Sequence, residues 1–178
     1  MPVQSAVSAQ ERAARHEHGG AIVWLTGQEG DGISQLARAT ERRLFDRGGS
    51  PIVLDRAALQ AGLNADLGDT PAERSEALRR IAGVAAHLAD NGFIAIVAAG
   101  PASMAERAHT REQSGKGFYA VHVAATGGPA DRDEPSAAPD LRIDAGRHDL
   151  ETDSLQIEHL LESAGMLGTG REGGEFAI

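Results

Sequence analysis

A glycine-rich turn follows the first strongly apolar segment of the chain, and its residue types are those of a phosphate-binding loop. The apolar segment is Ala21 to Thr26, and the turn reads GQEGDGISQ over residues 27–35. Such loops place backbone N–H groups around a phosphate and have the pattern G-x-x-x-x-G-K-[ST]. The residues that could form the loop are Gly27, Gly30, Gly32 and Ser34. The lysine position holds Ile33, so the turn has the spacing of a phosphate loop without its phosphate-binding cation.

Two interpretations of this turn are open. In the first, the N–H groups of residues 30–34 still bind an anion at the start of a helix. Glu29 and Asp31 oppose this, because a carboxylate about 4 Å from a phosphate charge costs about 4 kcal/mol at an effective dielectric constant of about 20. In the second, the glycines are kept because the turn needs their backbone freedom. We favour the second interpretation and therefore expect no cofactor. ATP with Mg²⁺ is expected as a ligand only if nucleotide binding has survived.

Composition restricts the classes of partner. The formal net charge of −9 argues against nucleic acid and against anionic membrane surfaces, since both favour basic proteins. The chain has no cysteine, and no apolar run approaches the roughly 20 residues of a membrane helix. We expect a cytoplasmic protein in which residues 1–18 form a flexible arm or short helix, 19–164 one domain, and 165–178 a flexible tail.

Apolar runs alternate with segments of helical periodicity along the domain. Strands are expected at residues 21–26, 51–54, 93–98, 118–123 and 141–143. Helices are expected from 33 to Gly48, from Thr70 to 90, near 104–113 and over 153–164. Thr70, Pro71 and Glu73 form the signature of a capped helix start. This alternation predicts an α/β fold of three layers, with helices on both faces of a parallel five-stranded sheet.

Several short motifs, in this order, resemble those of one family. They are His18 to Gly27 (HGGAIVWLTG), Gly62 to Gly68 (GLNADLG) and Pro139 to Asp144 (PDLRID). The chain thus resembles adenylylsulfate kinase, a P-loop kinase that phosphorylates the 3'-hydroxyl of adenosine 5'-phosphosulfate. The likeness runs from about His16 to Leu161, and it implies the P-loop NTPase-like version of the α/β fold.

The departures from the family pattern fall on its functional residues. Besides Ile33, the resemblance puts the catalytic acid at Ala57, a substrate arginine at Gln60 and an adenine-stacking ring at Asp69. The basic and aromatic lid of the family is missing, and only Ala124 to Ala138, with an acidic stretch at 131–134, spans that gap. With Ala57 in place of the acid, Ser34 alone is a poor Mg²⁺ site. We therefore expect no catalytic residues.

The joint loss favours a pseudoenzyme with a regulatory, scaffolding or protein-interaction role linked to sulfate activation. The resemblance implies a homodimer, or a partner protein of sulfate activation. Two alternatives stay open: an active adenylylsulfate kinase with rearranged chemistry, and a nucleotide sensor without turnover.

Other polar residues have both a binding and a structural interpretation. Arg74, Arg79 and Arg80 could bind an anion, or they could pair with neighbours such as Glu73 and Glu76. His16 and His18 lack a third ligand at useful spacing, so no metal site is expected. Asn64 is expected to fix the backbone of its loop whether or not a ligand binds.

Overall fold

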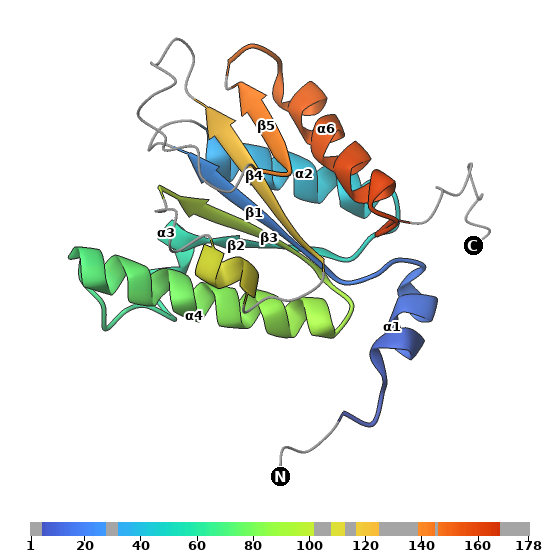
Figure 1. Ribbon diagram of the computed structural model, residues 1–178, viewed down its shortest axis with the longest axis horizontal. Coiled ribbons are helices and arrows are strands. Elements are labelled where there is room, and N and C mark those ends of the chain that lie inside the picture. The colour runs from blue at the N-terminus through green and yellow to red at the C-terminus, as the bar shows by residue number, and fades with distance from the viewer. Residues whose placement is uncertain are drawn as a thin grey trace.

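The centre of the molecule is a parallel sheet of five strands with the order β2-β3-β1-β4-β5 (Figure 1). The computed structural model describes residues 5–27, 32–101, 108–112, 117–124, 139–144 and 146–167. The strands are β1 Ala21–Gly27, β2 Pro51–Asp55, β3 Ile94–Gly100, β4 Phe118–Ala124 and β5 Leu141–Asp144. Every neighbouring pair is parallel. The predicted parallel five-stranded sheet is therefore confirmed.

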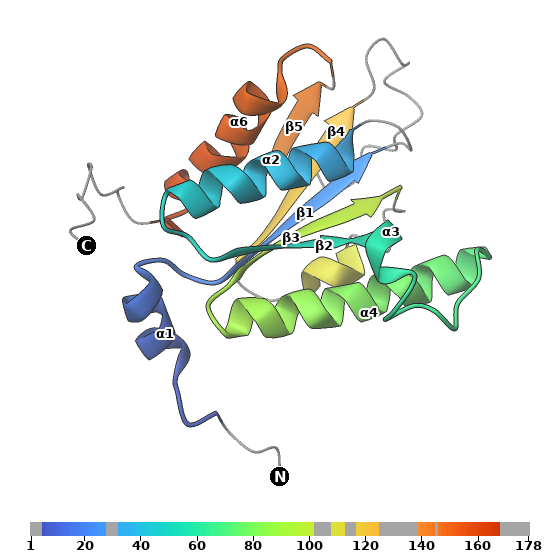
Figure 2. The same ribbon diagram turned by 180° about the vertical axis from the view of Figure 1, so that it is seen from behind.

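Helices cover both faces of this sheet, as predicted. The helices α2 (Ile33–Asp46) and α6 (Leu150–Ser163) lie together on one face, and α4 (Pro71–Asp90) lies on the other (Figures 1 and 2). The one-turn helix α3 (Arg56–Leu59) follows β2 directly. Of the helix expected near 104–113, residues 108–112 are described and helical. No helix in the described ranges is long and apolar enough to cross a membrane.

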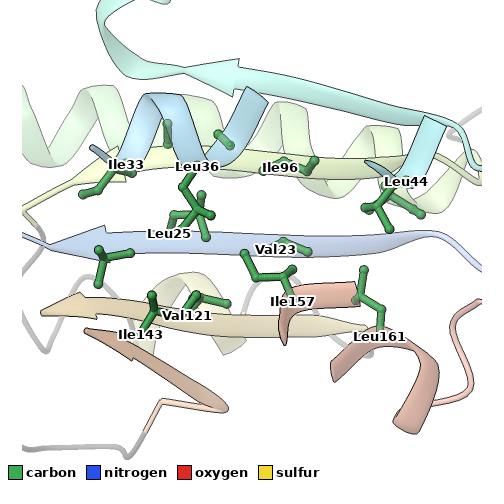
Figure 3. Packing of buried hydrophobic residues seen from close by; sticks show 14 of the residues in the cluster. Val23, Leu25, Ile33, Leu36, Leu44, Ile96, Val121, Ile143, Ile157 and Leu161 are labelled. Carbon is green, nitrogen blue, oxygen red and sulfur yellow. The ribbon is translucent and has the colours of Figure 1, made fainter. Parts of the chain in front are cut away.

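The central strand β1 explains how the three layers hold together. All seven of its residues are buried. Since successive side chains of a strand point to opposite faces, Val23 and Leu25 pack with α2 and α6 (Figure 3), while Ile22 and Trp24 pack on the side of α4. A strand buried on both faces appears in the sequence as a continuous apolar run, and such a run predicted β1.

Side-chain caps set the starts of the helices α4 and α6. The Thr70 hydroxyl accepts the N–H of Glu73 at 3.3 Å, and Glu73 accepts the N–H of Thr70 at 3.0 Å, so the predicted capping box is present. The predicted start of the last helix at Asp153 is wrong. Asp149 caps that helix instead, by accepting the N–H of Thr152 at 2.8 Å, and α6 begins at Leu150.

Ion pairs join α2 to α6 across one end of the molecule. Glu158 of α6 is buried, with a side-chain exposure of 8%, and pairs with Arg43 of α2 and with Arg47, which directly follows α2. The distance from Arg43 Nη1 to Glu158 Oε2 is 3.2 Å. Arg47 also pairs with Glu162 and holds the pKa of that carboxyl below its usual value. A buried carboxylate with two close guanidinium partners holds the two helices in register.

Both flanking segments contact the domain in their described parts. The N-terminal segment contains a short helix, α1 (Ala9–His16), which is one of the two forms expected for it. His18 Nε2 accepts the N–H of Ser50 at 3.0 Å, and the N–H of Gly19 donates to the carbonyl of Met166 at 3.1 Å. His16 and His18, which were considered as metal ligands, both have structural contacts. His16 Nδ1 lies 3.0 Å from Ser50 Oγ. The division into arm, domain and tail remains a prediction, and residues 168–178 lie outside the described residues.

We expect Leu36→Ala to lower the free energy of unfolding by about 2–4 kcal/mol, because Leu36 is 2% exposed and packs against β1. Phe45→Ala on the same helix is the control, since Phe45 is 60% exposed and should stay within about 1 kcal/mol of the wild type. Urea unfolding followed by circular dichroism measures both. Equal losses would contradict this assignment of the core.

Candidate functional site

A cleft of about 690 Å³ opens where β1, β2 and β3 end. Its walls are the first turn of α2, the segment from the end of β2 into α3, the loop before α4, and the end of β3. The lining residues are 32–35, 55–57, 60, 67–69, 74, 77 and 98–101. In open α/β sheets, ligands bind in the crevice at the carboxyl ends of the strands, because the strand ends and helix starts converge there.

The described part of the predicted phosphate loop lies at this cleft. Gly32 has a φ of +72° and directly precedes α2, so its backbone conformation strongly favours glycine. Ser34 lines the cleft in the first turn of α2, and Gly27 is the last residue of β1. Gly30, with the neighbouring Glu29 and Asp31, lies outside the described residues. The conformation of Gly32 agrees with the interpretation that this glycine is kept for the turn.

Ile33 is part of the core rather than of a polar site. It is 8% exposed and packs in the cluster that contains Leu25 and Leu36 (Figure 3), while one side of it lines the cleft. Because its side chain is aliphatic, it can neither donate a hydrogen bond nor compensate a negative charge. Among the described residues, the helix start offers backbone N–H groups and the side chains of Ser34 and Gln35 as donors toward the cleft.

Asp55 ends β2 and caps the short helix α3, which carries the altered position Ala57. Its Oδ1 accepts the N–H of Ala57 at 2.9 Å and that of Ala58 at 3.4 Å. Ala57, at the position that the resemblance assigns to the catalytic acid, brings only a methyl group to the cleft wall.

Gln60 has a structural role that the sequence did not reveal. Its Nε2 donates to the carbonyl of Asn64 at 2.9 Å and to that of Leu67 at 2.8 Å, which closes the loop between α3 and α4. Asn64, which was expected to fix the backbone of this loop, contributes to it through its main chain. The Asn64 side chain is fully buried, and its amide atoms have no hydrogen-bond partner among the described residues. Only its main chain helps, since Leu67 N donates to Asn64 O at 2.9 Å.

Asp69 lies between two arginines at the mouth of the cleft. Arg74 Nη1 is 3.3 Å from Asp69 Oδ1 and 2.5 Å from the Asp69 carbonyl oxygen. Arg56 Nη2 is 3.9 Å from the same Oδ1. Arg56 was not predicted from the sequence, although its place directly after β2 puts it at the same edge of the sheet as Ile33. The cleft thus combines two guanidinium groups with two carboxylates, those of Asp55 and Asp69.

The three arginines proposed as anion ligands differ in their surroundings. Arg74 lines the cleft, whereas Arg79 and Arg80 are absent from its described walls and are already paired. Arg79 binds Glu76 through two bonds of 2.6 and 2.8 Å. Arg80 binds Asp66 at 2.6 and 2.8 Å and Glu76 at 3.0 Å. For these two residues the surroundings favour ion pairing within the protein, and of the three only Arg74 faces a ligand-sized space.

Glu76 is the centre of this pairing. Hydrogen bonds from Arg79 and then Arg80 lower the pKa of Glu76 from 4.5 to about 2. Glu73 was also expected as an arginine partner, but it accepts the Thr70 hydroxyl and the N–H groups of Gly68 at 2.9 Å and Thr70 at 3.0 Å. The bond from the Thr70 hydroxyl, and then the two N–H groups, hold the pKa of Glu73 below its usual value. The segment before α4 is therefore held by Glu73 and by the Arg80–Asp66 pair.

The fold and this cleft define a class. A parallel sheet with its glycine turn between the central strand and a helix, and a cleft at that edge, is the arrangement of a P-loop kinase. The family described as Adenylylsulphate kinase matches residues 19–136. Solved APS kinase structures share the fold with TM-scores near 0.7. The chain belongs to the adenylylsulfate kinase family.

Individual relatives show how far the likeness extends. The adenylyl-sulfate kinase of Paraburkholderia xenovorans is 47% identical over 106 residues, which span 60% of this chain and 59% of that protein. The structure of Mycobacterium tuberculosis APS kinase CysC in complex with AMPPNP and APS is 30% identical, has a TM-score of 0.69, and covers 82% of this chain and 99% of its own. A hexameric APS kinase from Thiobacillus denitrificans is 33% identical, with a TM-score of 0.73, and covers 89% of this chain and 32% of its own.

We expect Gln60→Ala to loosen the loop between α3 and α4. The variant loses two hydrogen bonds to carbonyl groups, with a cost of about 1 kcal/mol because the side chain is partly exposed. Hydrogen exchange read by mass spectrometry should show faster exchange in residues 60–68. Gln35→Ala, at an exposed position of the same cleft, should leave this exchange unchanged. Unchanged exchange in Gln60→Ala would contradict the role assigned to Gln60.

The lowered pKa of Glu76 predicts a specific acid dependence of stability. A carboxyl whose pKa is about 2 when folded and 4.5 when unfolded contributes stability above about pH 4.5, and the contribution is lost as the pH falls toward 2. Glu76→Gln should therefore lose less stability than the wild type between pH 5 and pH 2. Urea midpoints across this range measure it, with Asp90→Asn at the exposed end of the same helix as the control. Parallel profiles for Glu76→Gln and wild type would contradict the prediction.

Proposed function

We propose that this chain is a non-catalytic member of the adenylylsulfate kinase family, which acts in sulfate activation by binding rather than by phosphoryl transfer. The observation that carries the proposal is the convergence of Ile33, Ala57, Gln60 and Asp69 on one preserved cleft. None of the four is a cation, and the one acid among them already pairs with Arg74 and Arg56.

Charge at the phosphate loop supports this proposal. Phosphoryl transfer depends on cations that stabilise the charge of the β and γ phosphates and of the transition state. The described cleft walls hold no lysine, and the single lysine of the chain, Lys116, lies outside the described residues. Removing one group that stabilises transition-state charge commonly costs a factor of about 10²–10³ in rate.

The second support is the acid–base chemistry. A general base must lie within hydrogen-bond reach of the proton that it accepts. Ala57 has no such group, and Oδ1 of the adjacent Asp55 is engaged in capping α3. The segment 125–138, in place of a basic lid, contains Asp131, Asp133 and Glu134 but no lysine or aromatic residue. It lies outside the described residues, so this support comes from the sequence.

The role that fits these features is a regulatory or scaffolding one, in a homodimer or with a protein of sulfate activation. The helix caps and both core clusters are intact, so the fold is still strongly specified. One similar protein is a hexameric APS kinase, which makes self-association the first partner to test. Light scattering after size exclusion, together with co-purification from the native cell, would identify the assembly.

We expect no 3'-phosphorylated product when the purified protein is mixed with Mg-ATP and adenosine 5'-phosphosulfate. Product formation by coupled assay or chromatography is the measurement, with an active relative run in parallel as the positive control. Turnover at the rate of that relative would overturn the proposal.

The double variant Ile33→Lys with Ala57→Asp should restore little of this turnover. The segment between Ala124 and Pro139 remains too short and too acidic to close over two nucleotides. The lysine would also replace an 8% exposed side chain of the core, so the variant should be less stable than the wild type. Circular dichroism must therefore show that the variant is folded before its rate is interpreted.

A further inference from the structure

The segment that follows α6 is joined to the segment that precedes β1, at the end of the sheet opposite to the cleft (Figures 1 and 2). The N–H of Gly19 donates to the carbonyl of Met166 at 3.1 Å, and His18 forms an antiparallel β-bridge with Leu167. We call residues 18–19 and 166–167 the terminal joint. Such a short pairing is not stable through its backbone bonds alone. Side-chain packing must therefore hold the joint closed.

The Met166 side chain supplies this packing. Its Cε lies 2.8 Å, and its Sδ 3.7 Å, from the position that a Cβ on Gly19 would take. The same Cε lies 3.7 Å from the corresponding position on Gly117, directly before β4. Met166 also packs, partly buried, against the core cluster that contains Leu161. The thioether thus lies between the segment before β1 and the residue before β4, and its approach to the first depends on the missing side chain of residue 19.

Met166 is also the one sulfur-containing residue among the described residues. The sequence has no cysteine, and Met1 and Met104 lie outside the described ranges. Met166 is partly exposed, so a small oxidant can reach it from solvent. Oxidation converts the apolar thioether into a polar, chiral sulfoxide. Because the methyl end already fills the space over Gly19, an added oxygen has no room there and needs water as its hydrogen-bond partner.

We propose that Met166 is an oxidation site for hydroperoxides and that its sulfoxide opens the terminal joint. The sulfur lone pair attacks one oxygen of hydrogen peroxide, an S–O bond forms as the O–O bond breaks, and the leaving hydroxide takes up the remaining proton to give water. Sulfur loses two electrons and the peroxide gains them. Methionine sulfoxide reductases reverse the step, with a dithiol as the reductant. The inference goes beyond the proposed function, because it involves neither the cleft nor a nucleotide.

The opening should stop at the end of α6. Glu158 holds this helix to Arg43 and Arg47, and these pairs do not involve the terminal joint. The strand β1 is buried on both faces and is paired with β3 and β4 along its length. The sulfoxide therefore frees residues 18–20 and 164–167, and it leaves the sheet and the cleft in place.

Peroxide treatment of the full chain, followed by peptide mapping and hydrogen exchange read by mass spectrometry, tests the proposal. The oxygen should be found on Met166, and exchange in residues 18–20 and 164–167 should become about tenfold faster. Exchange in residues 60–68, beside the cleft, should not change. Treatment with both methionine sulfoxide reductases should restore the slow exchange, and this comparison needs no variant.

Two variants provide matched controls. Met166→Leu keeps an apolar side chain of similar volume but has no sulfur, so its terminal joint should stay closed in peroxide. Met104→Leu removes a thioether elsewhere in the chain, so it should respond to peroxide as the wild type does. Circular dichroism shows whether each variant is folded.

Three results would overturn the inference. One is a Met166 that takes up no oxygen at a peroxide concentration that fully oxidises a synthetic peptide of the same local sequence. Another is Met166 sulfoxide with unchanged exchange in the terminal joint. The third is a Met166→Leu variant, shown to be folded, whose joint still opens in peroxide.

Discussion

Burial of β1 on both faces is the constraint on which the rest of this structure depends. Because every residue from Ala21 to Gly27 is buried, the strand has no place for a charged group along its length. Chemistry can begin only at its end, where the chain leaves the sheet and starts α2. β2 and β3 run parallel to it and end at the same edge, and so α3, the loop before α4 and the end of β3 must form one cleft with the start of α2.

Electrostatic pairing then distinguishes the cleft from the rest of the surface. Arg43 and Arg47 are paired with carboxylates of α6, and Arg79 and Arg80 are paired with Glu76 and Asp66. These pairs have at least one contact of 3.2 Å or less. At the cleft the contacts to Asp69 are longer, 3.3 and 3.9 Å, and the carboxylate is exposed. The positive charge that is least neutralised among these groups thus lies in the cleft at the strand ends.

The positions of the strands and helices could largely be predicted from the sequence, because they depend on local patterns. Continuous apolar runs gave all five strands to within two residues at each end, and the Thr70 capping box gave the start of α4. The start of α6 was misplaced, because Asp149 and Asp153 are both possible caps and their order of use depends on how the chain leaves β5.

The contacts inside the site were much less predictable. The cleft collects residues from four separate segments, and the sequence indicated that Ile33, Ala57, Gln60 and Asp69 belong together only through the resemblance to a family. It did not indicate that Gln60 holds the loop carbonyls, or that Arg56 reaches Asp69 across the cleft. Such contacts are set by side-chain rotamers and loop geometry, which no short pattern encodes. Asn64 shows the same limit. Its side chain was expected to be the important one in this loop, but it is buried, and the side chain of the exposed Gln60 holds the loop instead.

The altered positions have one feature in common that bears on function. Catalytic residues usually reduce stability, since like charges and desolvated polar groups must be held ready for a ligand. Here Ile33 packs in the core, Gln60 closes a loop, and Asp69 pairs with two arginines. Three of the four altered positions therefore make contacts within the chain. A cleft whose walls are stabilised in this way is expected to keep its shape without substrate.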